Sequence, residues 1–450
     1  MHGLFTPVVS MTTDQEVCTM TRKARSATAV AIGLGIALTA TGCAGGSTDG
    51  GGGSSDGQVT VTVWENATTG PGVKYWQDAA KAYHALHPNV TIKIQGIQNE
   101  DLDGKLQTAL NSSSAPDIFL QRGGGKMRAM VNAGQIQALD LTATDKANAG
   151  AAAIAGNTID GKVYAMPNDT QPEGIYYSKD LFKQAGITST PTTMDELEAD
   201  IAKLKAIDVA PIAVGAKDAW PAAHWYYNFA LRECSQDTLT TTAKSLEFTD
   251  ECWTKAGDDL DAFLKADPFQ KGFLTASSQQ GAGSSAGMLA NHKAAMELMG
   301  NWNPGVIASL TPNEKPLPDL GWFPFPAVAG GQGDPTAIMG GSDGYSLSRN
   351  APKDAFGFLQ FIVTKDQQEP FAKAFNAIPV NKDAQGVVTD SYNVSALQAF
   401  NKAGYAMQFL DTEYGQNVGN AMNTAVVNLL AGKGSAADIV KDTNAAAAKG

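Results

Sequence analysis

Strand-like and helix-like segments alternate from the point where the folded pattern of this chain begins. The first segment, VTVTVW at 59–64, alternates in side-chain type and is β-branched, as strands are. The next repeats apolar and aromatic residues at helical spacing, at Val73, Trp76, Ala80 and Tyr83. The pattern then predicts strands at 90–97 and 117–120, and helices at 102–110 and 126–133. A β-α-β-α-β-α order predicts a parallel sheet with helices on its faces.

The rest of the chain continues as α/β without an internal repeat. Thr193-Met-Asp-Glu196 is a capping box, which predicts a helix running to about residue 206. Further strands are predicted at 162–166, 174–177, 209–214, 295–299 and 345–348, and further helices at 222–231, 254–264, 355–363 and 423–431. A domain of this length is too long for one ordinary core, so we expect two units.

The N-terminal region has the pattern of an export signal. Three basic residues, Arg22, Lys23 and Arg25, precede an apolar run at 27–40. A run of this length, followed by small residues, indicates a signal peptide at 1–42 rather than a membrane span. Met20, followed by Thr-Arg-Lys, is a natural start for such a signal. No later apolar run is long enough to span a bilayer.

A cysteine and a glycine-rich stretch follow this signal. Ala40-Thr41-Gly42-Cys43 resembles the bacterial lipobox, whose cysteine receives a diacylglycerol, although the family usually has Leu where this chain has Ala40. Residues 44–57 contain seven glycines, which predicts a flexible leash over 43–57. The resemblance implies lipidation of Cys43 and a domain anchored to the outer face of the cytoplasmic membrane. The alternative is an ordinary secretory signal with a chance cysteine.

The charge balance limits the partners of the exported part. Residues 43–450 keep 30 of the 33 basic residues and 43 of the 45 acidic ones. An acidic domain without basic clusters argues against nucleic acid and anionic lipid as partners. It also disfavours a strongly anionic ligand.

Cys234 and Cys252 are the only cysteines after Cys43. An even pair in an exported protein is most simply a disulfide, with two free thiols as the alternative. Neither cysteine has a histidine at metal-ligand spacing, so we predict no zinc site, and nothing in the sequence calls for a cofactor.

Several ordered motifs carry a resemblance to a known family. GKVYAMP at 161–167, YYSKDLFKQAG at 176–186 and PTTMDEL at 191–197 resemble the solute-binding proteins of ABC importers, in the carbohydrate group similar to maltose-binding protein. Ser178 stands where that group usually has Asn, and Met194 where it has Trp. Segments at 116–125, 130–142, 339–371 and 377–384 agree with the same family in the same order.

The resemblance implies an α/β fold of the type II periplasmic-binding-protein class, with two lobes joined by three hinge crossings. The expected lobes are 58–167 plus 340–377 and 168–339 plus 378–450. A monomer would capture its ligand between the lobes, close by a hinge, and deliver the ligand to a permease. The stretch at 285–302 looks similar to actinobacterial binders of xylo-oligosaccharides, which favours a xylobiose-like ligand. A non-sugar solute, such as a polyamine or a peptide, is the alternative.

Candidate binding residues follow from the chemistry of sugars. Aromatic rings stack on the apolar face of a pyranose, and planar polar side chains bind its hydroxyl groups. Trp220 and Trp302 are the expected stacking residues. Polar candidates at the expected ligand site are Asn66, Gln121, Arg122, Asp169, Asn303, Asp343 and Asp411. The alternatives are that Arg122 pairs with a nearby carboxylate and that Asp411 caps a helix.

Enzyme motifs are not supported. GSSAG at 283–287 matches G-x-S-x-G, but it does not follow a strand, and only His292 comes after Ser285, with no acid between them. GGGK at 123–126 lacks the spacing and the Ser or Thr of a phosphate loop. A glycosidase would need a carboxylate pair, which we cannot identify. We therefore predict a binding protein and not an enzyme.

Overall fold

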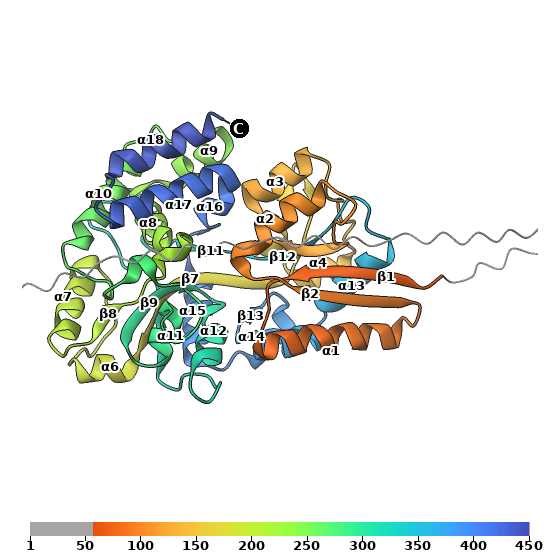
Figure 1. Cartoon of the computed structure of the whole chain (residues 1–450), viewed down its shortest axis with the longest axis horizontal. Coiled ribbons are helices and arrows are strands. Elements are labelled where there is room, and N and C mark those ends of the chain that lie inside the picture. The colour runs from red at the N-terminus through yellow and green to blue at the C-terminus, as the bar shows by residue number, and fades with distance from the viewer. Residues whose placement is uncertain (1–56, 450) are drawn as a thin grey trace, which may run out of the picture. The chain divides into compact units, whose positions relative to one another are not determined.

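The computed structural model describes residues 57–449 (Figure 1). The signal peptide at 1–42, the lipidation of Cys43 and most of the leash lie outside the described residues. Within residues 57–449, every helix is too short or too polar to cross a membrane.

The first sheet has the order β2-β1-β3-β12-β6. Its strands are β1 Val59–Glu65, β2 Val90–Gly96, β3 Ile118–Gln121, β6 Met166–Pro167 and β12 Gly344–Leu347. β1 lies parallel to both β2 and β3, which confirms the parallel arrangement expected from the first six segments. β12 then joins β3 and β6 in antiparallel pairing, so a strand from far along the chain completes the sheet.

Helices with one apolar face cover this sheet. They are α1 Gly70–Leu86, α2 Asn99–Leu110, α3 Gly124–Asn132, α13 Asp354–Ile362 and α14 Lys365–Phe375. α1 buries Tyr75, Trp76, Ala79 and Tyr83, which recur every three to four residues and so share one face. Trp76 contacts Tyr345 edge-on, with ring centroids 5.1 Å apart. The core of this part therefore joins the early helices to strands and helices near residue 350.

The second sheet is built around β7 Asp169–Ser178, the long strand in the middle of Figure 1. Its path is β14-β11-β7-β9-β8, and β10 and β13 also pair with β7. The strands are β8 Ala210–Ile212, β9 Ala294–Gly300, β10 Leu320–Phe323, β11 Ile338–Gly341, β13 Ile378–Pro379 and β14 Ala406–Met407. β7 is antiparallel to β9, β10, β11 and β13, and only a ten-residue strand is long enough for so many partners.

Helices pack on both faces of the second sheet. α8 Trp220–Glu233 lies against β9, and α10 Cys252–Leu264 and α17 Gln416–Leu430 pack on α8 in one apolar core. On the other face, a second apolar cluster joins β7, β9 and β10 to α11 Ser285–Ala290, α12 Asn303–Leu310 and α15 Ser391–Lys402. Ile175 and Tyr176 of β7 belong to opposite cores, as alternation along a strand requires.

Three segments run between the two sheets. The first connects β6 of the first sheet, which ends at Pro167, to β7 of the second, which begins at Asp169. The second connects β11, which ends at Gly341, back to β12, which begins at Gly344. The third connects α14 to β13 through a short turn. The three segments meet at the start of β7. There Asp169 pairs with Pro379 of β13, and the Asp343 N–H donates to its carboxylate at 3.2 Å. The α/β fold with two sheet-containing lobes is thus as expected, while the lobe boundaries given above stay a prediction.

Cys234 and Cys252 form a disulfide. The bond joins the end of α8 to the start of α10. Towards the other end of this helix pair, Trp225 and Phe263 stack with ring centroids 5.1 Å apart. Closing a loop of 18 residues' separation stabilises the folded state by about 3 kcal/mol in the chain-entropy model. The disulfide interpretation is confirmed, and the free-thiol alternative is wrong for this structure.

Local signals predicted some elements closely. The Thr193 hydroxyl accepts the Glu196 N–H at 3.3 Å, and the predicted capping box opens α7 Met194–Lys205. The predicted strand at 162–166 is wrong as one strand. It divides into β5 Lys162–Val163, which pairs with β4 Thr158–Ile159, and β6, which pairs with β12, because its two ends bind different partners. The remaining helices are α4 Ala143–Ala149, α5 Ala151–Gly156, α6 Lys179–Gln184, α9 Gln236–Ser245, α16 Leu410–Glu413 and α18 Ala436–Ala447.

Candidate functional site

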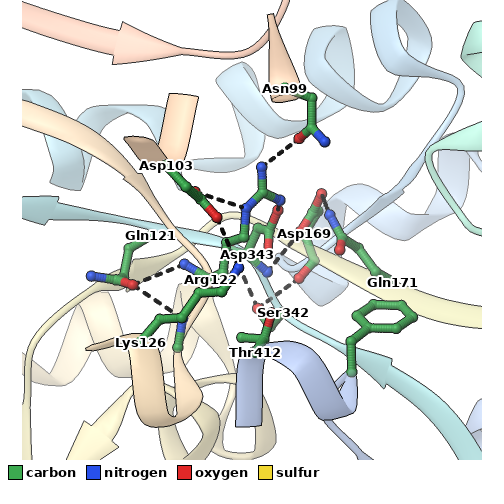
Figure 2. A network of polar contacts seen from close by, with 12 residues as sticks. Asn99, Asp103, Gln121, Arg122, Lys126, Asp169, Gln171, Ser342, Asp343 and Thr412 are labelled. Carbon is green, nitrogen blue, oxygen red and sulfur yellow. Dashed lines mark hydrogen bonds and ion pairs between the residues drawn. The ribbon is translucent and has the colours of Figure 1, made fainter. Parts of the chain in front are cut away.

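Arg122 lies at the centre of a polar cluster just after β3 (Figure 2). Its guanidinium donates to Asp343 at 3.2 Å and to the Asn99 side-chain oxygen at 2.5 Å, and its Nε lies 3.7 Å from Asp103. Burial acts to lower the pKa of Arg122, but the carboxylates of Asp343, Asp103 and Asp411 outweigh burial and raise it. Arg122 therefore stays charged, and its pairing with nearby carboxylates is confirmed.

A second cation supports the same cluster. Lys126, in the first turns of α3, bonds Asp103 of α2 at 2.8 Å. Burial would raise the pKa of Asp103, but Lys126 and Arg122 together lower it. This ion pair joins α2 to α3, two helices that cover the first sheet, and it holds Asp103 beside Arg122.

Two carboxyl groups meet where the crossing segments meet. Asp169 and Asp343 are both 9 % exposed. Gln171 donates to Asp169 at 2.9 Å, and the Ser342 hydroxyl donates to the Asp169 carbonyl at 2.7 Å. Burial, together with the neighbouring Asp343, raises the pKa of Asp169 to about 8. Because Arg122 favours charge on Asp343, we assign the proton at neutral pH to Asp169.

The segment 408–415 reaches this cluster from the second sheet. Gln408 donates to the Arg122 carbonyl at 2.7 Å. A Cβ atom on Gly125 would stand 2.6 Å from the Glu413 carbonyl, and one on Gly124 would stand 2.8 Å from the Thr412 carbonyl. Gly124 also has a φ of +56°, so a side chain here would be strained as well as crowded. The glycines after Arg122 thus permit backbone to approach backbone.

Next to Gln408, Phe409 belongs to an aromatic group with Trp220, His224 and Trp302. Trp220 opens α8, and Trp302 directly precedes α12. The ring centroids of Trp220 and Trp302 are 6.1 Å apart, and those of Trp302 and Phe409 are 5.6 Å apart. His224 stacks on Phe409 at 4.8 Å. The indole nitrogens of both tryptophans are buried without a hydrogen-bond partner among the described residues.

A buried carboxylate holds the histidine of this group. Glu173 of β7 is 1 % exposed and pairs with His224 Nδ1. Asn228, one helical turn after His224, donates to the other Glu173 oxygen at 2.6 Å. A second carboxyl, Glu297 of β9, accepts a hydrogen bond from Asn303 at 2.8 Å. The aromatic group therefore rests on buried polar pairs.

The structure brings the predicted residues together in two sets. Arg122, Asp169 and Asp343 form one set, and Trp220 and Trp302 form the other. Gln121 is buried beside the first set, where its side-chain oxygen accepts the Arg122 and Gly123 N–H groups and so holds the turn.

Three predicted residues lie outside these sets. Asn66 is partly buried after β1, beside Glu65, whose pKa is raised to about 7 by burial. Asn303 is fully buried, with its amide nitrogen bound to Glu297. Asp411, in α16, accepts a hydrogen bond from Asn423 at 3.1 Å. Contact of any of these residues with a ligand stays a prediction.

Sequence reasoning missed residues that lack a local signal. Asn99, Asp103 and Lys126 lie on exposed-looking helix faces, and Gln408 and Phe409 lie in a loop between two short elements. Only the i, i+4 spacing of Arg122 and Lys126 at the end of a strand could have suggested a shared anion partner.

Two hollows open elsewhere on the surface. One, of about 490 Å³, is lined by residues such as Lys146, Ile154 and Asp160, and the other, of about 430 Å³, by residues such as Asn291 and Lys315. Neither is lined by a predicted binding residue. In residues 57–449, no group of three or more His, Cys, Asp or Glu side chains is arranged to hold a metal ion.

Comparison with known proteins identifies the family. Residues 66–369, more than half of the chain, match the model described as bacterial extracellular solute-binding protein. The chain belongs to this family. Its members work outside the cytoplasm. The matched range includes Trp220, Trp302 and the Arg122 cluster, and it ends before Asp411.

Some curated relatives carry the names of sugar-binding proteins. The lactose-binding protein of Rhizobium radiobacter is 28 % identical over 335 residues, which cover 69 % of this chain and 71 % of that protein. The melibiose/raffinose/stachyose-binding protein of Bacillus subtilis is 23 % identical over 325 residues, covering 70 % and 72 %. Both relatives are named for the sugars that they bind.

Solved structures share the fold. A protein from a study of xylan utilization by Caldanaerobius polysaccharolyticus superposes with a TM-score of 0.79 at 25 % identity, over 86 % of this chain and 99 % of that one. A chitin oligosaccharide binding protein superposes with a TM-score of 0.77 at 22 % identity, over 87 % and 98 %. The two-lobed, type II fold is thus confirmed.

Proposed function

We propose that this protein is the lipid-anchored substrate-binding component of an ABC sugar importer. It would capture a di- or oligosaccharide between its lobes and deliver it to the permease. The observation that carries the proposal is the aromatic group, in which Trp220 at the start of α8 and Trp302 before α12 lie with ring centroids 6.1 Å apart, and Phe409 lies beside Trp302. Aromatic rings grouped in this way suit the apolar face of a sugar ring.

The polar cluster completes the chemistry that a sugar requires. Gln408 bonds Arg122, and the next residue, Phe409, contacts Trp302, so two consecutive residues join the charged and aromatic sets. A pyranose has an apolar C–H face, which suits aromatic rings, and hydroxyl groups, which donate to carboxylates and accept from indole N–H groups. We assign ligand contact to these two sets before Asn66 and Asp411, which lie outside them.

The anchor and the lobes follow from the sequence and the crossing segments. Cys43 would carry the lipid, and a leash of 14 glycine-rich residues has a root-mean-square reach of roughly 20 Å. The lobes would be 58–167 plus 340–377 and 168–339 plus 378–450, since β7 and β12 begin close to these boundaries. A monomer closing about Asp169 and Asp343 would present the bound sugar to the permease.

The names of the relatives support an oligosaccharide, and we favour a xylobiose-like ligand. The second candidate is a cationic solute such as a polyamine, because four carboxyl groups, Asp103, Asp169, Asp343 and Asp411, act on or surround the two cations Arg122 and Lys126. We propose no catalytic activity, and incubation with an oligosaccharide should yield no shorter products.

Thermal unfolding of residues 58–450 in the presence of single ligands tests the proposal. The panel holds xylo-, malto- and galacto-oligosaccharides, with polyamines and peptides as alternatives. A ligand at a hundred times its Kd stabilises the folded state by about 2.7 kcal/mol, so the midpoint should rise clearly with one sugar series. A rise with a polyamine or peptide alone would contradict the sugar assignment and leave the fold intact.

A further inference from the structure

Trp302 is held between two buried amide side chains. Its ring folds back over Gly300, where a Cβ atom would stand 2.1 Å from the ring. On one side, Asn301 donates to Asn393 of α15 at 2.7 Å and accepts the Ile378 N–H of β13 at 2.9 Å. On the other side, Asn303 donates to Glu297 at 2.8 Å. Asn301 and Asn303 are both fully buried, so these bonds fix the backbone that carries Trp302.

The bond between Asn303 and Glu297 leaves two buried acceptors. Asn303 Oδ1 has no hydrogen-bond partner among the described residues, although Asn303 Nδ2 and Glu297 Oε2 are already joined. Glu297 Oε1 has no partner of its own either, since the Ser285 hydroxyl, which also acts on Glu297, donates to the Ser278 carbonyl at 3.1 Å. A charged carboxylate offers no proton to either atom. An unsatisfied buried polar group costs about 1–3 kcal/mol, so two such atoms on one bonded pair of side chains require an explanation.

We infer that Glu297 is an uncharged carboxylic acid that pairs with the Asn303 amide through two hydrogen bonds and thereby positions Trp302 for the ligand. In this pair the Asn303 N–H donates to Oε2, and the Glu297 O–H donates to Asn303 Oδ1. One proton on Glu297 satisfies both acceptors. Glu297 is a positioning residue here, because it acts on the sugar only through Trp302, and in this respect the inference rests on the proposed function.

Within residues 57–449, no cation is among the groups that act on Glu297. Tyr176 of β7 stands opposite it in the sheet, and α11 and α12 (SAGMLA and NPGVIASL) carry no ionisable side chain. Beyond Tyr176, the titratable groups are Glu173 of β7 and Tyr392 of α15. Burial raises the pKa of Glu297 to about 7, although hydrogen bonding by the Ser285 and Asn303 side chains lowers it by a smaller amount.

The sign of the pH dependence follows. A raised folded-state pKa means that the pair is intact at low pH and is lost as the pH rises through about 7. Sugar affinity should then fall above that pH, by about tenfold one unit above the pKa if binding requires the protonated pair. Glu65 and Asp169 have raised pKa values too, so wild-type affinity alone does not isolate Glu297.

The variant Glu297→Gln isolates the effect of Glu297 titration on sugar affinity. A glutamine amide donates to Asn303 Oδ1 and accepts from the Asn303 side-chain N–H at every pH. The experiment measures Kd for the sugar that stabilises the protein, for wild type and Glu297→Gln, between pH 5.5 and 9. The ratio of wild-type to variant Kd should be near one at pH 5.5 and rise about tenfold by pH 8. Glu198→Gln, an exposed site on α7, is the matched control and should follow wild type. A ratio that stays constant with pH would overturn the positioning role.

A second measurement does not depend on sugar. Infrared difference spectra between wild type and Glu297→Gln at pH 5.5 should show the C=O stretch of one protonated carboxyl, which disappears as the pH rises. Absence of this band overturns the protonation of Glu297, whatever the protein binds. If the band is present but no sugar binds, the proposed function fails while the acid–amide pair stands.

Discussion

The Arg122 cluster and the aromatic group around Trp302 differ in how completely their polar groups find hydrogen-bond or ion-pair partners. Arg122 directs its guanidinium at Asp343, Asn99 and Asp103, and Lys126 completes the set. Trp220 and Trp302 pack ring against ring, and neither indole N–H has an acceptor among the described residues, as is also true of Trp225 and Trp253 in the core. The comparison teaches that paired charges fix the Arg122 cluster, whereas the packing of rings fixes the aromatic group.

The largest expected effect on stability comes from removing Arg122 from its cluster. Arg122→Ala leaves Asp103 and Asp343 without their shared partner, and loss of one member of a largely buried ion pair should lower the free energy of unfolding by about 3 kcal/mol. Urea denaturation measures it. Arg128→Ala, which removes a half-exposed partner of Asp160, is the matched control and should cost under about 1 kcal/mol. Equal losses in the two variants would show that the cluster does not hold the fold.

Changes in the aromatic group should lower the affinity for sugar. Trp302→Ala and Trp220→Ala should each weaken sugar binding by about 2 kcal/mol, or roughly thirtyfold, because a central aromatic anchor is lost. Titration calorimetry gives the Kd. Trp64→Ala, in β1 against the core of the first sheet, should reduce stability and leave affinity unchanged. If both the Trp302→Ala and Trp220→Ala variants bind sugar normally, our ligand site is wrong.

Titration of Asp169 sharpens the comparison, since it changes charge without removing atoms. Its pKa is raised to about 8, so the folded state holds a proton that the unfolded state releases near pH 4. The stability that this proton gives is complete below about pH 4 and is lost as the pH rises through about 8, with a slope of at most about 1.4 kcal/mol per pH unit. Asp169→Asn should flatten this part of the stability–pH curve. An unchanged slope in the variant would place the titration elsewhere.

The smallest effect is expected from an exposed contact beyond both sets. The Gln280 side chain donates to Glu100 at 3.4 Å, joining the loop before α11 to α2. Since both residues are exposed, Gln280→Ala should change the activation free energy of sugar dissociation by no more than about 0.5 kcal/mol, or roughly twofold in rate. Stopped-flow fluorescence can resolve that limit. A large increase in the dissociation rate would mean that this loop, and not the aromatic group, retains the ligand.

Local pattern predicted the elements whose pairing partners are near in the sequence. β1 follows from alternation, α1 from the helical spacing of Val73, Trp76, Ala80 and Tyr83, and α7 from its capping box. The prediction failed at 162–166, where two short strands serve different partners. It also could not show that Asn303 bonds Glu297, because the same residue types would suit an exposed ligand contact.

The sequence by itself therefore determined the α/β order, the family resemblance, the cysteine pair and the residue types suited to a sugar. Only the tertiary structure decided which of those residues meet. Gln408 bonds Arg122 across 286 positions of chain, and Asp343 bonds Asp169 across 174. Hydrophobic periodicity reports which face of an element is buried, but contacts across crossing segments depend on how distant strands pair, and no local spacing encodes that pairing.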